Sequence, residues 1–384
     1  MRRFFYLTTS IAYVNAPPHI GFALESVQAD VYARYYKKLG KNVYFLTGTD
    51  EHGAKIAMAA EMANKTPKEL VDENSEKFKN LKSALNLSWD NFIRTSDRKI
   101  HWPVAQELWK RLKDNGDIYK RTYKGLYCVG HEAFITQKDL VGGKCADHQK
   151  EPEAIEEENW FFKLSKYSNE IKRFITDGEL RIVPETRKNE ILSLLNEGLE
   201  DISFSRPAKD LSWGIPVPDD ASQTMYVWAD ALSNYISGLS DSASQSLASW
   251  EEHPADIHFI GKDILRFHAA IWPAILLSAG LPLPKSIFVH GHIMSGGQKM
   301  SKSLGNVIDP FELVKKYGVD AVRYFLLREI PSDGDGDFSY EKFEDRYNGD
   351  LANGLGNLVA RVAAIGEKLG EIKIGPSFFD RLFS

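Results

Sequence analysis

A histidine and a glycine stand at the expected start of the first long helix. His19-Ile20-Gly21 follows the loop 15–18, and the helix that it opens is expected to end near Gly40. Unpaired backbone N–H groups and the helix dipole make such a helix start favourable for a phosphate group. Gly21 would let a nucleotide approach the backbone, and His19 could donate a hydrogen bond to a phosphate oxygen. Taken alone, this pattern is more often an ordinary helix start than a nucleotide site.

Two lysines flank small hydroxyl residues in the second pattern, Lys299-Met300-Ser301-Lys302-Ser303. Gly296-Gly297 precedes this segment, and Leu304-Gly305-Asn306 follows it. A mobile loop that carries two cations can close over a triphosphate and stabilise the charge that develops at the α-phosphate. For either lysine alone, a solvated basic loop is the plain alternative.

The two patterns, about 280 residues apart, together resemble the signatures of the class I aminoacyl-tRNA synthetases. In that class the first helix carries His-Ile-Gly-His and a mobile loop carries Lys-Met-Ser-Lys-Ser. The resemblance implies an ATP-dependent ligase that forms an aminoacyl-adenylate from ATP with Mg²⁺. It implies that Lys302, Lys299 and His19 are catalytic. The residues that it implies for ATP binding are His19, Gly21, Gly261, Asp263, His290 and Lys302.

The first signature has one departure, because Phe22 stands where the class has its second histidine. A phenyl ring cannot donate a hydrogen bond to a phosphate, so one contact to ATP is missing. We expect this change to affect the rate of adenylate formation. His292, in the segment that leads to the lysine loop, is a candidate replacement.

Five further segments resemble the methionine-specific members of this class, and the similarity is closest to bacterial and mitochondrial forms. The segments are 11–15, 48–53, 213–216, 227–232 and 261–263. The resemblance implies an aromatic slot for a thioether, whose sulfur packs well against ring edges, and an aspartate for the ammonium group. Core packing is the commoner role for any one of these aromatic residues taken alone. The implied methionine-binding residues are Ile11, Tyr13, Asp50, Trp228, Ala231, Leu232, Tyr235, Ile264 and His268.

Both cysteines of the chain fall in two short pairs, Cys128-x-x-His131 and Cys145-x-x-His148. Pairs at this spacing on tight turns suit a tetrahedral zinc ion with four protein ligands, which is a structural site. Related enzymes usually have cysteine at the position of His131, and histidine is also a zinc ligand. The alternative is an ordinary turn at Gly130-His131 without a metal.

Residues 350–368 have the pattern of a helix on which Asn357 and Arg361 share one face. The resemblance implies that these two residues read anticodon bases of tRNA(Met), including the initiator tRNA. Relatives continue into a larger helical bundle, whereas this sequence ends at Ser384. We therefore expect only the start of a C-terminal helical anticodon-binding domain.

The expected activity is the activation of methionine with ATP and its transfer to the 3′ end of the tRNA. The expected insertion is too small for the editing domain that synthetases need when side chains differ by one methylene. Two alternatives remain. A catalytically silent tRNA-binding paralogue would suit Phe22. A small adenylyltransferase of the same superfamily would lack the helix that carries Asn357 and Arg361.

The bulk composition is that of an ordinary globular protein. The formal net charge of −5 argues against indiscriminate binding of nucleic acids. Residues 1–9 lack the features of a signal peptide, and the apolar stretch 271–283 contains prolines and is too short to span a bilayer. We expect a cytoplasmic protein without a membrane partner.

The elements that must position these residues alternate between strand and helix. We expect strands at 4–9 and 43–46, with 48–53 leaving the second strand as a polar loop. Thr66-Pro67-Lys68-Glu69 has the form of a capping box that opens another helix. In the first helix the apolar positions recur at spacings of three and four, at Leu24, Val27, Val31, Tyr35 and Leu39.

This alternation predicts an α/β fold with a parallel sheet and a ligand site at the carboxyl ends of its strands. The resemblance specifies a Rossmann-like catalytic domain with an inserted zinc-knuckle domain. The expected division has four parts. They are 1–116 and 206–330 for the two catalytic halves, 117–205 for the insertion, and 331–384 for a stem-contact region with a truncated helical domain.

Overall fold

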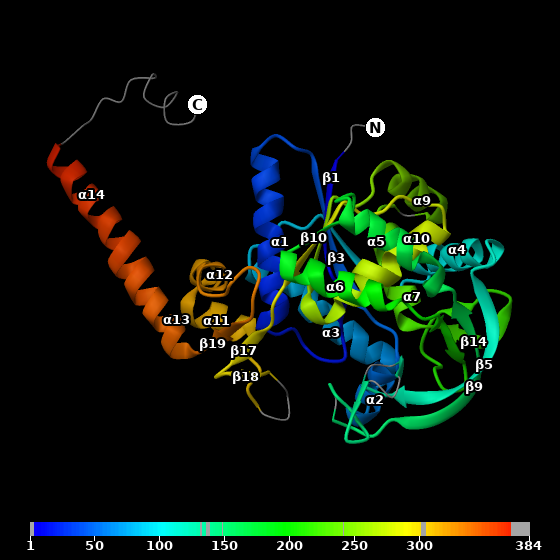
Figure 1. The fold of residues 1–384 in the computed structure, drawn as a ribbon. Helices are drawn as coiled ribbons and strands as arrows, with labels where there is room; N and C mark the ends of the chain where they lie inside the picture. The colour runs from blue at the N-terminus through cyan, green and yellow to red at the C-terminus, as the bar shows by residue number, and fades with distance from the viewer. Residues whose placement is uncertain are drawn as a thin grey trace.

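A parallel sheet forms the centre of the molecule (Figure 1). The computed structural model describes residues 4–130, 133–135, 139–147, 149–240, 242–300 and 305–369. Within these ranges seven strands pair in the order β10-β16-β15-β1-β3-β2, with β4 also beside β3, and every pairing is parallel. The α/β prediction is confirmed. The strands are β1 (Phe5–Thr9), β2 (Ala12–Tyr13), β3 (Val43–Asp50), β4 (Asn91–Arg94), β10 (Arg181–Val183), β15 (Ile257–Gly261) and β16 (Ser286–His290).

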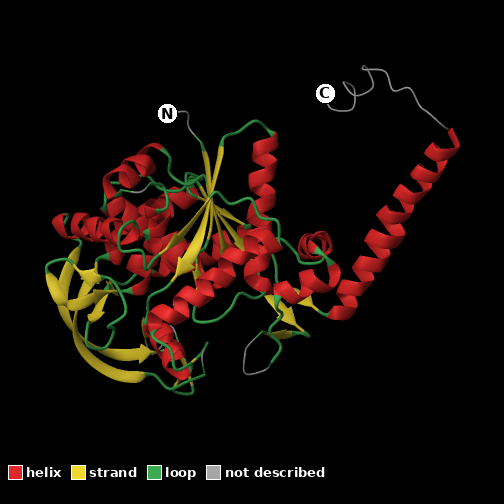
Figure 2. Ribbon diagram, turned by 180° about the vertical axis from the view of Figure 1, so that it is seen from behind, coloured by secondary structure: helices red, strands yellow, loops and turns green. Residues whose placement is uncertain are grey.

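Helices cover both faces of this sheet (Figure 2). Helix α1 packs along β1, β3 and β15 on one face, and the core on the other face contains α4 and α10. Each face therefore buries its own apolar cluster. The helices around the sheet are α1 (Ile20–Lys38), α2 (Ala54–Met62), α3 (Pro67–Ala84), α4 (His101–Asp114), α5 (Ser168–Thr176), α6 (Glu185–Glu197), α7 (Val227–Leu232), α8 (Asn234–Ser237), α9 (Ala243–Glu252) and α10 (Trp272–Ser278).

Of the five apolar positions noted in the sequence of α1, only the first two are buried. Leu24 and Val27 are fully buried, but Val31, Tyr35 and Leu39 are 38%, 58% and 57% exposed. The far end of the helix instead packs through small side chains, which bring its backbone close to the sheet. The fully buried small residues in this part of the helix are Ala29 and Ala33.

An aspartate is also buried in α1, which a count of apolar residues does not anticipate. Asp30 is fully buried and accepts hydrogen bonds from Arg34 at 2.7 Å, Arg323 at 2.6 Å and the backbone N–H of Ser88 at 2.7 Å. A buried carboxylate is tolerated when its oxygens are paired in this way. The arrangement also fixes α12 (Val319–Arg328) against α1.

Strand β3 continues through Gly48, Thr49 and Asp50, so the prediction of a loop from residue 48 was wrong. The strand needs glycine at position 48 because a Cβ atom there would lie 2.2 Å from the carbonyl oxygen of Ile93 in β4. The extension places Asp50 at the carboxyl end of the strand. The capping box at Thr66 and Glu69 is confirmed.

A long antiparallel ribbon of β5 and β9 stands at one side of the central sheet (Figure 2). Residues 181–183, inside the range expected for the insertion, return to the central sheet as β10 and pair with β16. The elements outside the central sheet here are β5 (Ile118–Cys128), β6 (Ala133–Ile135), β7 (Leu140–Val141), β8 (Lys144–Cys145), β9 (Glu153–Phe162), a 3₁₀ turn at Leu164–Tyr167, β11 (Ile202–Ser203), β12 (Ser205–Pro207), β13 (Pro216–Val217) and β14 (Asp220–Met225).

The C-terminal part begins with a small sheet in which β17 (Ile293–Ser295) pairs with both β18 (Gln298–Lys299) and β19 (Gly336–Phe338). Helices α11 (Pro310–Tyr317), α12 and α13 (Tyr340–Arg346) follow, then a π-helical stretch at Tyr347–Gly356 and α14 (Asn357–Leu369). Helix α14 projects from the body (Figure 1), and its side chains Leu358, Val359, Val362 and Ile365 are more than half exposed. No helix in the described part of the chain has the length and apolar character that crossing a membrane requires.

Candidate functional site

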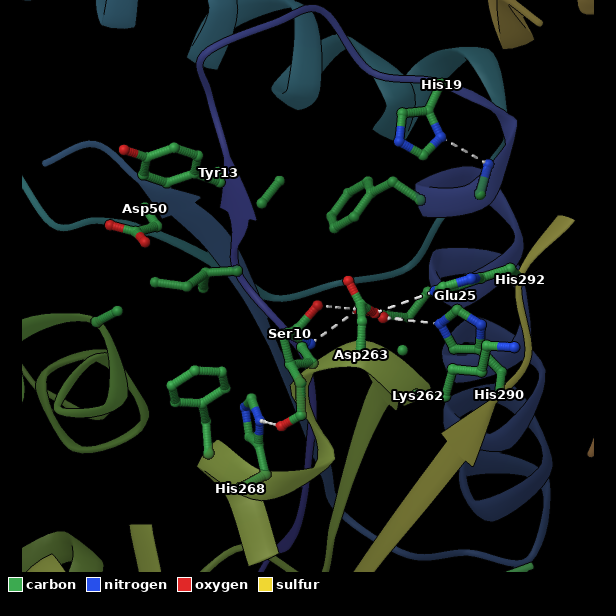
Figure 3. A pocket seen from close by; sticks show the side chains of 18 of the residues that line it. Ser10, Tyr13, His19, Glu25, Asp50, Lys262, Asp263, His268, His290 and His292 are labelled. Carbon is green, nitrogen blue, oxygen red and sulfur yellow. Dashed lines mark hydrogen bonds and ion pairs between the residues drawn. The ribbon is translucent and has the colours of Figure 1, made fainter. Parts of the chain in front are cut away.

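A cavity of about 930 Å³ opens at the carboxyl ends of β1, β3, β15 and β16. Ligands of open α/β sheets bind at this edge, and the volume suits a small-molecule site. Figure 3 shows that Tyr13 and Asp50 lie at one end of the cavity, and His19 and His292 at the other. The cavity is therefore a single site with two ends of different chemistry.

All nine residues predicted for methionine line this cavity. They come from four separate segments: the loop after β1 with β2, the end of β3, helices α7 and α8, and the turn after β15. Trp228 stacks on Phe267 with ring centroids 3.7 Å apart. The nine residues are Ile11, Tyr13, Asp50, Trp228, Ala231, Leu232, Tyr235, Ile264 and His268.

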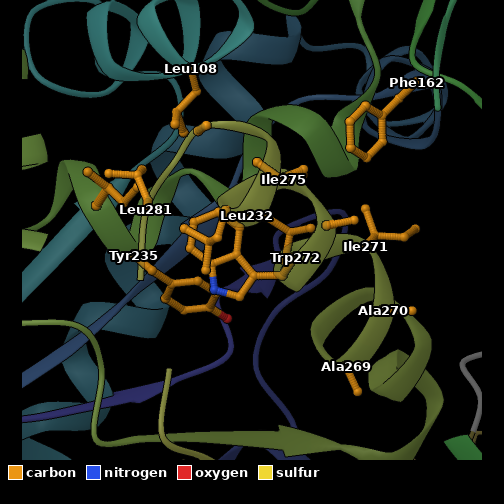
Figure 4. Close-up of a cluster of buried hydrophobic side chains, with 14 of the residues drawn as sticks. Leu108, Phe162, Leu232, Tyr235, Ala269, Ala270, Ile271, Trp272, Ile275 and Leu281 are labelled. Atoms are coloured by element: carbon orange, nitrogen blue, oxygen red, sulfur yellow. The ribbon is translucent and has the colours of Figure 1, made fainter. Parts of the chain in front are cut away.

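The aromatic wall of this end is fixed by hydrogen bonds. His268 is 1% exposed, and its Nδ1 lies 3.0 Å from the carbonyl oxygen of Ile264. A carbonyl can only accept, so Nδ1 carries the proton and Nε2 accepts from the Tyr235 hydroxyl at 2.7 Å. Behind this wall, Leu232 and Tyr235 pack with Trp272 in the main core (Figure 4).

Burial holds His268 in its neutral form. It lowers the pKa of His268 from 6.5 to about 4. Because the unfolded state binds this proton below pH 6.5 and the folded state does not, stability is lost as the pH falls from 6.5 towards 4. The loss from this residue alone is about 2 kcal/mol at pH 5.

We expect the His268→Gln variant to lose less unfolding free energy between pH 7 and pH 5 than the parent chain, by about 2 kcal/mol. Urea denaturation at both pH values measures this difference. Burial also lowers the pKa of His258, so some acid sensitivity remains in the variant. Equal losses in the two proteins would contradict the assignment of a buried neutral His268.

At the other end, His19 caps the N-terminus of α1. Its Nδ1 accepts a hydrogen bond from the backbone N–H of Gly21 at 3.1 Å, which leaves the proton on Nε2. Burial lowers the pKa of His19, Asp263 opposes that shift, and His292 adds to it. A neutral imidazole with an Nε2–H donor therefore lines this end of the cavity.

Glu25 is a site residue that the sequence did not reveal. It is 3% exposed, and one of its carboxylate oxygens accepts from the backbone N–H and the hydroxyl of Ser10, at 2.9 and 2.6 Å. The other oxygen lies 2.9 Å from Nε2 of His290. Burial favours neutral His290, but the hydrogen bond to Glu25 and its charge, together with the Gly291 carbonyl and Asp263, outweigh burial and raise the pKa of His290. The pair ties β1, α1 and β16 together beneath the cavity (Figure 3).

The described residues that flank the lysine segment lie at the cavity and at the start of α1. Gly296 and Gly297 adopt positive φ angles of 61° and 75° in the turn between β17 and β18, a conformation that favours glycine. Lys299 and Met300 then line the cavity. Residues 301–304, which include Lys302, lie outside the described residues. Past them, the carbonyl oxygen of Ile308 accepts from the backbone N–H of Ile20 at 3.0 Å.

A second network that the sequence did not reveal lies near the end of the cavity that contains Asp50. Asp230 is 1% exposed, and its two oxygens lie 2.6 Å from Nδ1 of His52 and 2.8 Å from Nε2 of His101. Burial raises the pKa of Asp230, but the two histidines outweigh burial and the net shift is downward. The network joins the loop after Asp50 to helix α7, which carries Trp228.

The two cysteines lie close together in the insertion. Cys128, at the end of β5, and Cys145, at the end of β8, are 3% and 1% exposed and belong to one small cluster with Ile135. His131 and His148 lie outside the described residues. Among the residues that are described, no group of three or more histidine, cysteine or acidic side chains is placed to hold a metal ion.

Asn357 and Arg361 lie on α14, away from the cavity. The side chain of Asn357 donates to the carbonyl oxygen of Asn353 at 2.9 Å. Both residues are exposed, one turn apart, on the helix that projects from the body (Figure 1).

The cavity at the strand ends, the histidine-bearing helix start and Lys299 at the cavity wall define a class I aminoacyl-tRNA synthetase catalytic domain. The family described as "tRNA synthetases class I (M)" matches residues 5–151 and 135–363. The methionine–tRNA ligase of Thermotoga maritima is 47% identical over 95% of this chain, and that of Brucella suis is 46% identical over 97%. The chain belongs to the methionine–tRNA ligase family.

Solved structures agree with this assignment. The Mycobacterium tuberculosis methionyl-tRNA synthetase in complex with methionyl-adenylate is 45% identical and superposes with a TM-score of 0.87, covering 94% of this chain and 71% of that one. The free form of the same enzyme gives a TM-score of 0.77. The chain spans 58% of the length of the Thermotoga relative and 72% of the Brucella relative.

Proposed function

We propose that the chain activates methionine with ATP to methionyl-adenylate and transfers the methionyl group to the 3′ end of tRNA(Met), initiator tRNA included. The observation that carries the proposal is that one cavity is lined both by all the predicted methionine residues and by His19, Gly261, Asp263, His290 and Lys299. Relatives of this chain at 46–47% identity are named methionine–tRNA ligases.

In the first step a carboxylate oxygen of methionine attacks the α-phosphorus of Mg-ATP. A new P–O bond forms, the bond to the bridging oxygen breaks, and pyrophosphate leaves. His19 supplies an Nε2–H donor beside the helix N-terminus, and Lys299 with Lys302 supplies positive charge. These groups act by positioning and by stabilising charge that develops on the phosphate oxygens.

The other end of the cavity would hold methionine in a fixed orientation. Asp50, 6% exposed at the end of β3, pairs with the ammonium group. The thioether lies among the rings of Tyr13, Trp228 and Tyr235, where a polarisable sulfur gains favourable contacts. His268 is neutral and leaves no buried charge near the apolar side chain.

In the second step the terminal adenosine of the tRNA accepts the methionyl group. We assign anticodon recognition to Asn357 and Arg361, whose side chains are exposed and can hydrogen-bond to unstacked bases. We also retain the four-part division of the chain at residues 116, 205 and 330, with β10 contributing to the catalytic sheet.

We assign a structural zinc ion to Cys128, His131, Cys145 and His148. The support is that the two cysteines are brought into one buried cluster, although they are 17 residues apart in the chain. Thiolate and imidazole are the ligands that zinc prefers, and four of them close a tetrahedral site. Bound there, zinc would stabilise the fold of the insertion.

The purified chain is expected to contain about one zinc ion per molecule by elemental analysis. The Cys145→Ala variant should lose the zinc and the aminoacylation of tRNA, whereas methionine-dependent pyrophosphate exchange largely survives. Lys144→Ala, an exposed neighbour in the same hairpin, serves as the matched control and should keep its zinc. A metal content near zero in parent protein prepared without chelators would exclude the site.

The experiment that tests the proposed function is methionine-dependent exchange of labelled pyrophosphate into ATP. It reports the first step alone and needs no tRNA. We expect exchange with methionine and little with leucine or isoleucine. A chain that binds tRNA(Met) but shows no exchange would be a silent paralogue, and the proposal would be wrong.

A further inference from the structure

The nucleotide end of the cavity has one unusually apolar wall. Phe22, in the first turn of α1, packs edge to face against Phe78 with ring centroids 5.1 Å apart and an interplanar angle of 80°. Both rings line the cavity. Neither ring can donate a hydrogen bond to a nucleotide, so this wall offers contact area but no polar partner.

His292 is a histidine that lines the same cavity as Phe22. It lies at the same end as His19 (Figure 3). Its Nε2 is 3.4 Å from a carboxylate oxygen of Asp263, and 27% of its side chain is exposed. The ring is therefore near the nucleotide end without being locked into the core.

The backbone of His292 is fixed more firmly than its ring. Its N–H donates to a carboxylate oxygen of Asp335 at 2.8 Å, and its carbonyl oxygen accepts from the N–H of Gly336 at 2.9 Å. Asp335 is itself held by Lys262, whose Nζ lies 2.8 and 2.6 Å from its two oxygens. These contacts fix the backbone from which the His292 ring projects, which limits where the ring can lie.

We propose that His292 donates a hydrogen bond to an oxygen of the bound nucleotide and so replaces the donor that Phe22 cannot supply. The inference rests on the proposed function for the presence of a nucleotide at this end. The acceptor is a phosphate or a ribose oxygen, since both lie within the chemistry of an imidazole N–H donor. His292 then touches the substrate, and Asp335 is a residue that positions it.

Two variants of similar size test the hydrogen bond directly. His292→Gln keeps a side-chain donor, whereas His292→Leu removes it. We expect His292→Leu to weaken ATP binding about tenfold, and His292→Gln to weaken it much less, because a hydrogen bond to a charged group has about this effect on affinity. Methionine affinity should stay within about twofold in both variants.

A histidine at position 22 tests the replacement itself. Phe22→His should change ATP affinity little in the parent chain but restore most of the lost affinity in the His292→Leu background. Such coupling is the sign that two residues serve one contact. If Phe22→His improves ATP binding equally in both backgrounds, the two residues act independently and the proposal is wrong.

Equilibrium dialysis with labelled ATP and labelled adenosine measures both affinities without requiring catalysis. A loss for ATP alone identifies a phosphate oxygen as the acceptor, and a loss for both ligands identifies the ribose. No loss for either ligand in His292→Leu overturns the proposal. Gln298→Ala, an exposed change in the neighbouring hairpin, is the control for local disturbance. If the parent protein binds ATP but shows no methionine-dependent exchange, the proposed function is wrong. The ATP affinities of the His292 variants would still test the hydrogen bond.

Discussion

Lys302→Ala is expected to lower the maximal rate of methionine-dependent pyrophosphate exchange by roughly 100- to 1,000-fold, which corresponds to about 3–4 kcal/mol of transition-state stabilisation. The segment that carries Lys302 begins at the β17–β18 hairpin and returns to the start of α1 through Ile308 and Ile20. In the proposed mechanism, the positive charge of Lys302 acts on the charge that develops at the α-phosphate. Interactions of this kind are lost from kcat rather than from substrate binding.

The discriminating measurement is the separation of kcat from methionine affinity. Methionine binding, followed by the quenching of tryptophan fluorescence, should stay within about twofold of the parent. Lys68→Ala, which removes an exposed lysine paired with Asp72, should leave both quantities unchanged. A variant that binds methionine far more weakly but keeps its maximal rate would show that Lys302 does not act on the transition state.

The Asp50→Asn variant is expected to raise the KM for methionine by about 100-fold, or about 2.7 kcal/mol, with a smaller effect on the KM for ATP. Asp50 is nearly buried at the carboxyl end of β3, so an ammonium group bound beside it would be partly desolvated. The amide is nearly the same size as the carboxylate, and the variant therefore removes charge without opening a cavity.

A ligand that lacks the amino group makes this test specific. Inhibition by 4-(methylthio)butanoate should be nearly the same for the parent and for Asp50→Asn, because this compound has no ammonium group for Asp50 to bind. If the variant loses affinity equally for methionine and for the analogue, Asp50 supports the shape of the pocket instead.

The sequence predicts well those parts of the fold that depend on contacts between residues close together in the chain. The capping box at Thr66 and Glu69 forms because its partners are three residues apart. The loop predicted at Gly48 was wrong because the glycine serves a contact with Ile93, which is distant in sequence. Local preference at Gly48 was overridden by the packing of a neighbouring strand.

The same distinction explains the site. Signature residues such as His19 and Lys299 could be found because their types and order are unusual. Glu25 and Asp30 could not, since an acidic residue in a helix is normally exposed. Besides nearer partners, each has a partner far along the chain, His290 for Glu25 and Arg323 for Asp30, that helps to compensate its charge. The periodicity of apolar residues within a helix does not indicate such long-range pairs.

The strand order of the central sheet also sets the order in which this chain can fold as it is synthesised. Strand β1 can pair with β3 early. Its other neighbour, β15, is about 250 residues away in the sequence and can pair with β1 only later. The ribbon of β5 and β9 needs only local closure and can form in the meantime. Until β15 has been synthesised, β1 therefore has one unpaired edge, and unpaired strand edges promote the association of incompletely folded chains. The contacts of Glu25 with His290 and of Asp30 with Arg323 need residues still farther along the chain, so they can form only after β15 has been made.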